Sequence, residues 1–191
     1  MDYASYLRVL LSVWVGLGLG QLVQALHRLA RFRGHVKWDW LPLSWAALSF
    51  LFVVQTWWAY YALIQSPLWV NLFAFLLPLS VFVIMYLICA AALPDVTRAP
   101  EAEALDLEAF YFGQRHYFFG LWGALLLLAL IVARLVRGQF DLIGAEGFRL
   151  AGLAAAVLMA STRRRTVHVV VTLLAVGALT LYITLFTLRL A

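Results

Sequence analysis

Two glutamines and three histidines are the residues whose types and spacing could do chemistry in this chain. Gln21, Gln24 and His27 recur every three residues, so they share one side of a helix. His116 and His168 stand at the ends of later apolar runs. An amide inside a membrane must find a partner or line a wet cavity, because lipid offers no hydrogen bonds. All five are therefore candidates for a ligand or ion pathway, with interhelical hydrogen bonding as the alternative.

Imidazole side chains at a similar depth could also bind a metal ion or coordinate haem iron axially. No two of the four histidines have an i, i+4 spacing, and none has a neighbouring carboxylate in a metal-binding motif. The single cysteine, Cys89, lies inside an apolar run and adds no ligand cluster. We therefore expect no cofactor, and keep haem or metal ligation by His27, His116 and His168 as a lesser alternative.

Catalytic motifs are absent from the sequence. It has no nucleophile elbow, no His-Glu-x-x-His, no phosphate-binding glycine loop and no pair of carboxylates within an apolar run. The only lysine, Lys37, lies between apolar runs, where it could not hold a Schiff base inside the membrane. We therefore expect that the protein is not an enzyme.

The elements that must position these residues are membrane helices. Of 191 residues, 65% are hydrophobic and 12% charged, whereas a soluble domain has about 45–50% and about 25%. Since a spanning helix needs about 20 apolar residues, we expect one all-α, polytopic transmembrane domain. Its six predicted spans lie at residues 6–26, 41–63, 68–93, 117–136, 143–161 and 167–188. The fifth is the weakest, because it includes Glu146 and Arg149, which could pair on one helix face.

The basic residues predict the orientation of the bundle. The first, third and fifth connections hold nine lysines and arginines, against five on the other side. By the positive-inside rule these connections are cytoplasmic and both termini are outside. The net charge of +5 is then a feature of membrane topology, and no nucleic acid partner is expected.

The cytoplasmic connections alternate in charge. The first carries +3, the loop at 94–116 carries −3 and the fifth carries +3. The acidic loop could dock between the two basic ones, or it could be a solvated loop that balances charge. The basic loops could also hold a protein partner or anionic lipid.

Small residues on the first span predict a packing face. Ser12, Gly16 and Gly20 recur every four residues, which lets another helix approach closely, and Gly18 widens the groove. A neighbouring helix could come close at Gly16 and Gly20, just outward of the two amides, and close the site from the outer side.

Several segments resemble a family. The residues at 16–31, 40–46, 55–59 and 111–119, about a third of the chain, look like a group of small, uncharacterised bacterial membrane proteins with about six spans. The resemblance implies a multi-pass protein of the bacterial inner membrane, and it implies no catalytic or ligand residues.

The leading functional interpretation is a channel or small transporter that assembles as a homo-oligomer in membrane lipid. The alternative is a non-transporting component that recruits a protein or anionic lipid through its charged cytoplasmic loops. If there is a site, we expect it in the cytoplasmic half, against the first and sixth spans. Gln21, Gln24 and His27 would face it, and His116 and His168 would stand at its mouth.

Overall fold

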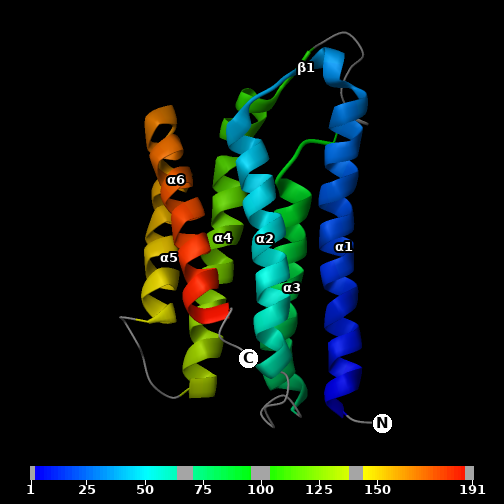
Figure 1. Cartoon of the computed structure of the whole chain (residues 1–191), viewed down its shortest axis with the longest axis vertical. Helices are drawn as coiled ribbons and strands as arrows, with labels where there is room; N and C mark the ends of the chain where they lie inside the picture. The colour runs from blue at the N-terminus through cyan, green and yellow to red at the C-terminus, as the bar shows by residue number, and fades with distance from the viewer. Residues whose placement is uncertain (1–2, 64–70, 96–103, 138–143, 188–191) are drawn as a thin grey trace.

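The computed structural model describes residues 3–63, 71–95, 104–137 and 144–187. These residues form six long helices (Figure 1). They are α1 (Tyr3–Arg31), α2 (Trp40–Leu63), α3 (Leu72–Ala91), α4 (Leu107–Arg137), α5 (Ala145–Ser161) and α6 (Arg165–Tyr182), and a π-helical turn at Ile183–Thr187 extends α6. Two short strands, β1 (Val36–Lys37) and β2 (Leu105–Asp106), lie in the connections, with a 3₁₀ turn at Arg33–His35 before β1. The prediction of an all-α fold is confirmed.

Five of these helices are long and apolar enough to cross a membrane. The stretches are Leu7–Arg31, Trp40–Tyr60, Leu72–Ala91, Leu107–Leu135 and Arg165–Leu185. At 1.5 Å per residue, a helix of 20 residues spans about 30 Å, the thickness of the hydrocarbon layer. The protein is therefore a multi-pass membrane protein. The remaining helix, α5, has 17 residues and is the one that the sequence predicts to be the weakest span.

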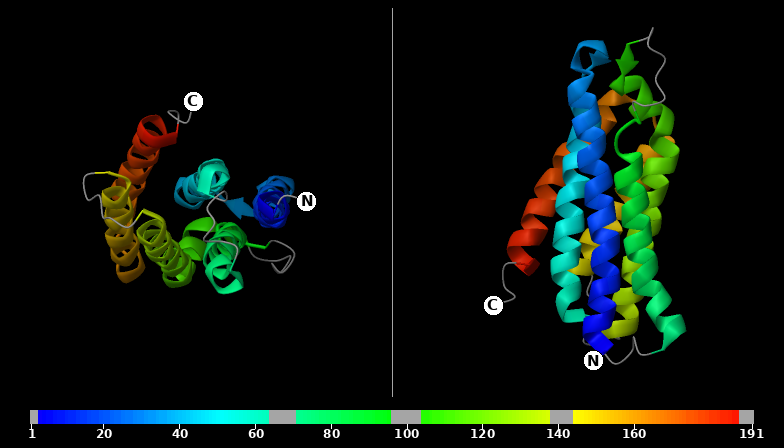
Figure 2. Two further views of the ribbon diagram at one scale, coloured as in Figure 1. Left: turned by 90° about the horizontal axis from the view of Figure 1, so that it is seen from below. Right: turned by 90° about the vertical axis from the view of Figure 1, so that its right-hand side faces the viewer.

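The helices run up and down, so that their connections alternate between two ends of the bundle. The α1–α2, α3–α4 and α5–α6 connections lie at one end, which we call the loop end (Figure 1). α1 begins, and α6 ends, toward the other end, which we call the terminal end. α1 packs against α3 and α2 at one edge of the bundle, while α5 and α6 lie at the opposite edge (Figure 2).

The helix bounds differ most from the predicted spans at α4. This helix begins at Leu107, ten residues before the predicted start at Tyr117, so the second half of the acidic loop at 94–116 is helical. The reason is local: the Asp106 carboxylate accepts a hydrogen bond of 3.0 Å from the backbone N–H of Ala109 and caps the helix. Parts of the other predicted spans, at 68–70, 143 and 188, lie outside the described residues.

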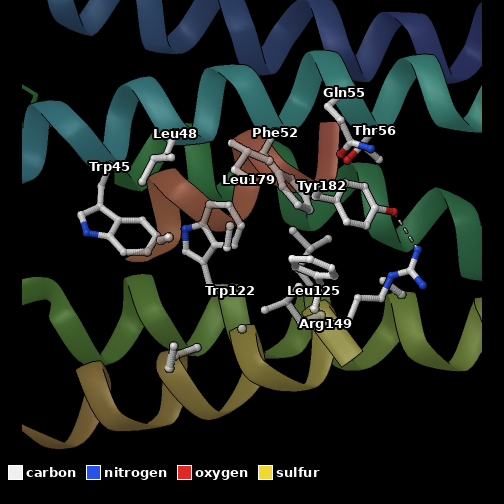
Figure 3. Close-up of a pocket in the computed structure, with 18 of the residues that line it drawn as sticks. Trp45, Leu48, Phe52, Gln55, Thr56, Trp122, Leu125, Arg149, Leu179 and Tyr182 are labelled. Carbon is white, nitrogen blue, oxygen red and sulfur yellow. Dashed lines mark hydrogen bonds between the residues drawn. The ribbon is translucent and has the colours of Figure 1, made fainter. Parts of the chain in front are cut away.

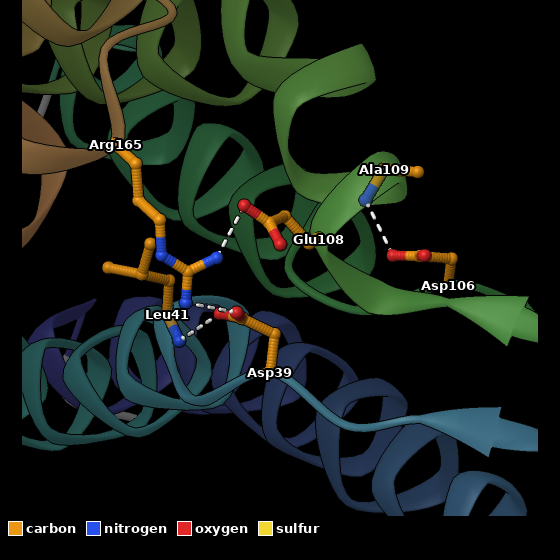
Figure 4. A network of polar contacts seen from close by, with 6 residues as sticks. All are labelled: Asp39, Leu41, Asp106, Glu108, Ala109 and Arg165. Atoms are coloured by element: carbon orange, nitrogen blue, oxygen red, sulfur yellow. Dashed lines mark hydrogen bonds and ion pairs between the residues drawn. The ribbon is translucent and has the colours of Figure 1, made fainter.

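Ion pairs and a strand pair join the three connections at the loop end. β1 and β2 pair in parallel, and Lys37 lies 3.7 Å from Asp106. Arg165, at the start of α6, contacts the Asp39 carboxylate at 2.6 Å and also pairs with Glu108 on α4 (Figure 4). The docking of the acidic connection between its basic neighbours is therefore confirmed for the described residues.

One face of α1 packs on the bundle, and it is not the face with the three evenly spaced small residues. Gly18 is buried, and a Cβ atom added there would lie 3.5 Å from Tyr86 Cα on α3. No described atom lies within 4 Å of a Cβ added at Gly16 or Gly20, and Ser12 is exposed. The close approach within the chain thus occurs at Gly18. A packing role for Ser12, Gly16 and Gly20 stays a prediction about contact with another molecule.

Candidate functional site

A cavity of about 210 Å³ lies inside the bundle, and we call it the central cavity (Figure 3). It is lined by residues of α2, α4, α5 and α6, with one contribution from α3, Val81. Most of its lining is apolar and much of that is aromatic: Trp45, Phe52, Tyr60, Phe119, Trp122, Phe148 and Tyr182. Small residues of α5 and α6, among them Gly152, Ala156 and Ala175, leave the space that the rings surround. All the described lining residues belong to one chain.

Aromatic rings meet edge to face in the middle of the cavity. The Trp122 ring lies 5.7 Å from the Trp45 ring and 5.0 Å from the Phe52 ring, centroid to centroid. These are the favoured distances for aromatic pairs, so the rings hold one another in place. Trp122 is buried, and its indole N–H has no hydrogen-bond acceptor among the described residues. The surrounding rings cover this N–H, so the face that Trp122 turns to the cavity is apolar.

Polar groups gather at the cavity end nearer the terminal end of the bundle. Figure 3 shows Arg149 there with Gln55 and Thr56, opposite Trp45. The Arg149 guanidinium contacts the Tyr182 hydroxyl and the Glu146 carboxylate, each at 3.4 Å. The Glu146 side chain is 2% exposed and that of Arg149 is 19% exposed. The predicted pairing of these two charges on one helix face is confirmed, and α5 holds the guanidinium against the cavity.

A buried hydrogen-bonded cluster closes the other end of the cavity. We call Trp45, Tyr111, His168 and Thr172 the histidine cluster. The Trp45 indole N–H donates to the Thr172 hydroxyl at 3.0 Å, and that hydroxyl donates to the His168 backbone carbonyl at 2.7 Å. His168 Nδ1 lies 2.8 Å from the Tyr111 hydroxyl, and its Nε2 lies 3.1 Å from the Thr162 carbonyl. The cluster ties α2, α4 and α6 together on the loop-end side of the cavity.

The hydrogen bonds of His168 assign its tautomer. A carbonyl oxygen only accepts, so Nε2 carries the proton and donates to Thr162. In the neutral imidazole, Nδ1 is then the acceptor for the Tyr111 hydroxyl. The rings of Phe112 and Phe119 face this imidazole edge to face, at 4.9 and 5.8 Å.

The residues predicted to form a site are not brought together. Gln24 and His27 are exposed on α1, Gln21 is half-buried there, and α1 contributes nothing to the described lining of the central cavity. His116 is exposed on α4, with Nε2 2.7 Å from the Arg115 guanidinium. Of the five, His168 alone is fully buried, and it lies beside the cavity. α1 and α6 lie at opposite edges of the bundle (Figure 2), so the described residues of these two helices do not come together.

The histidines also remain apart from one another. Within the part of the chain that the structure describes, no group of three or more histidine, cysteine or acidic side chains is placed to hold a metal ion. Both nitrogens of His168 are engaged in protein hydrogen bonds. Metal or haem ligation by His27, His116 and His168 gains no support from this placement.

Only some of the residues that line the central cavity have a signal in the sequence that marks them. The pair Gln55 and Thr56 interrupts an apolar run, and the Glu146–Arg149 pair interrupts the weakest span. Both interruptions mark the polar end of the cavity. Trp122 had no such signal, because a tryptophan in an apolar helix can face lipid or protein equally well.

No family model, no curated protein and no solved structure matches the chain. The family that the sequence resembles is therefore not identified. The chain is a small polytopic helical membrane protein with five candidate spans among its described residues.

Proposed function

We propose that the protein is a small-molecule transporter of the bacterial inner membrane, and that its substrate binds in the central cavity. The observation that carries this proposal is a cavity lined by five helices, apolar along most of its length and polar at one end. Such a site is typical of small-molecule recognition, where a few placed polar groups orient the ligand. A channel would need a continuous wet path, whereas here the histidine cluster fills the loop-end side with buried groups. This favours a transporter over a channel.

The charge distribution supports an orientation with the loop end in the cytoplasm. Helices and connections at that end carry eight described basic residues, namely Arg28, Arg31, Arg33, Lys37, Arg115, Arg163, Arg164 and Arg165. Four described arginines, Arg8, Arg134, Arg137 and Arg149, stand toward the terminal end. The positive-inside rule then places both termini outside and the polar end of the cavity in the outer half of the membrane.

Assembly as a homo-oligomer belongs to the same proposal. Its support is the outward face of α1, where the described chain leaves Ser12, Gly16 and Gly20 uncovered. Because the cavity lies within one chain, the oligomer would stabilise the protein in the membrane without building the pathway.

A second function, docking of anionic lipid or a protein at the loop end, has one observation in its favour. Arg31, Arg33, Arg163 and Arg164 are exposed, and none has an acidic partner among the described residues. Four arginines near a membrane surface would attract anionic headgroups. Other charges of the loop end, those of Arg28, Lys37 and Arg165, are already paired within the chain.

Uptake by proteoliposomes tests the transporter. A panel of small organic acids, amines and neutral aromatic compounds is offered, and the trapped solutes are quantified by mass spectrometry. At least one class should equilibrate faster than in protein-free liposomes. Ala156→Phe should lower this rate about tenfold or more, because the added ring occupies the space in which the substrate would bind.

The matched control is Ala154→Phe, on the exposed side of the same helix, and it should leave the rate unchanged. Equal rates with and without protein for every solute would contradict the proposal. So would equal loss of uptake in both variants, since only Ala156 lines the cavity.

A further inference from the structure

The size of the central cavity limits its ligand to about one ring with a short substituent. An apolar protein cavity of about 150 Å³ binds benzene, and the central cavity has about 210 Å³. The extra volume lies along a cavity that runs from Trp45 to Arg149 (Figure 3). A ring therefore leaves room for one or two carbon atoms and a polar head.

The lining indicates an aromatic body. Much of the lining is aromatic, and the rings of Trp45, Phe52 and Trp122 contact one another at favoured distances. A flat ring can pack on such a lining by edge-to-face contact, which a flexible alkyl chain cannot do.

The charge at the polar end indicates an anionic head. A guanidinium has five N–H donors, and the described contacts of Arg149 use two of its nitrogens, each at the long distance of 3.4 Å. The fork geometry of guanidinium suits a carboxylate. Arg149 is the one charged residue among the described residues that line the cavity, so the charge that a ligand meets there is positive.

Glu146 acts as a positioning residue in this arrangement. Its buried carboxylate holds the guanidinium from the α5 side, three residues away on the same helix. Glu146 is not among the cavity-lining residues, whereas Arg149 is. The Glu146 carboxylate thus holds the Arg149 guanidinium in place from outside the cavity. The other side of the guanidinium faces into the cavity.

We infer that the central cavity binds a small aromatic carboxylate, with the carboxylate on Arg149 and the ring against the aromatic lining that includes Phe52 and Trp122. This rests on the proposed function, because it names the substrate class of the same cavity. Tyr182, Gln55 and Thr56 supply further polar groups around the head (Figure 3).

Calorimetric titration of the purified protein in detergent tests the ligand class. The probes are 3-phenylpropionate, its amide, phenethylamine and octanoate. The aromatic acid should bind about ten- to hundredfold more tightly than the amide, because a hydrogen bond to a charged group contributes more than a neutral one. The amine and octanoate should bind more weakly than the aromatic acid. Equal or tighter binding of the amide or the amine would overturn the anionic head, and equal or tighter binding of octanoate would overturn the aromatic body.

Two variants test whether the carboxylate of the ligand binds Arg149. The double variant Glu146→Gln with Arg149→Gln removes the pair without leaving a buried lone charge, and it should lower the affinity for 3-phenylpropionate about ten- to hundredfold while leaving amide binding unchanged. Arg134→Gln is the matched control: it removes one charge from an exposed residue at the same end, and should preserve the affinity. Unchanged acid binding in the double variant would overturn the inference.

The binding and uptake experiments distinguish a wrong ligand class from a wrong assignment as a transporter. Tight binding of the aromatic acid without its uptake in proteoliposomes would remove the transporter and leave the ligand class standing. Uptake of another solute class, unaffected by the double variant, would remove the ligand class and leave the transporter. No binding of 3-phenylpropionate to the intact protein would overturn the inference.

Discussion

The His168 side chain has both ring nitrogens in use, one toward the Tyr111 hydroxyl and the other toward the Thr162 carbonyl. A neutral imidazole can do this, because one nitrogen accepts while the other donates. A metal ion or haem iron would have to displace one of these bonds in a fully buried place. The hydrogen bonds therefore make His168 part of the closed end of the cavity, whereas its sequence position predicted the mouth of a site.

A substitution of Thr172 tests how much the hydrogen bonds at this closed end stabilise the protein. Its hydroxyl is the acceptor for the buried Trp45 N–H, and it is 0% exposed. Thr172→Val keeps the shape but leaves that donor without an acceptor, so the free energy of unfolding should fall by about 1–3 kcal/mol. The measurement is unfolding by denaturing detergent in mixed micelles.

Thr180→Val on the same helix provides the comparison. The Thr180 hydroxyl is exposed and bonds only the backbone carbonyl of Val176. We expect a change within about 0.5 kcal/mol, as for other surface substitutions. Equal stability of the two valine variants would mean that the Trp45 bond contributes nothing.

The start of α4 depends on a side chain of the connection before it. Asp106 accepts a hydrogen bond from the Ala109 N–H, and this bond, helped by nearby Lys37, lowers the carboxyl pKa below its ordinary value of 3.8. A lowered pKa in the folded state means that the ionised form stabilises the fold. This contribution is complete above the ordinary pKa and is lost as the pH falls through the lowered value.

Asp106→Ala should therefore destabilise the protein by about 0.5–2 kcal/mol at pH 7, the usual effect of removing an N-cap. The difference between the variant and the natural protein should shrink below about pH 4, where Asp106 takes up a proton. Asp106→Asn should keep most of the stability at pH 7, because asparagine is also a good N-cap. Unfolding in mixed micelles at several pH values measures the stability of the natural protein and of both variants. If Asp106→Ala lowers the free energy of unfolding equally at pH 3 and pH 7, the capping role is contradicted.

The number and order of the helices could be predicted from the sequence, because apolar runs separated by charge are a property of the chain alone. The face that each helix turns toward the interior of the bundle could not be predicted from the sequence. Lipid is as apolar as the protein interior, so a membrane helix has no hydrophobic side that marks its core face. Gln24 faces outward and Trp122 faces the cavity for reasons that only the packing of neighbouring helices decides.

The whole molecule is arranged around a cavity that excludes α1. α2, α4, α5 and α6 surround it, α3 lies between α1 and α4, and the ion pairs of Arg165 join the connections above it. The arrangement depends on α5 and α6 forming a hairpin within the membrane. α5 is the critical element, because its 17 residues span about 25 Å, less than the hydrocarbon layer of about 30 Å.

A short helix can still cross a bilayer that thins locally. If α5 crosses, Arg164 lies on the same side of the membrane as Arg33, as the loop end of the structure has it (Figure 1). If it does not, Arg164 lies with Asn71 on the opposite side.

Cysteine labelling in spheroplasts distinguishes these arrangements. In a Cys89→Ala background, single cysteines replace Arg33, Arg164 or Asn71, each of which is exposed. A thiol reagent that cannot cross membranes should label Asn71→Cys from outside and leave Arg33→Cys and Arg164→Cys protected until the cells are opened. The physical reason is the excess of basic residues at the loop end, which retains that end in the cytoplasm. Labelling of Arg164→Cys together with Asn71→Cys would show that α5 does not cross, and the central cavity would then lack the wall that carries Arg149.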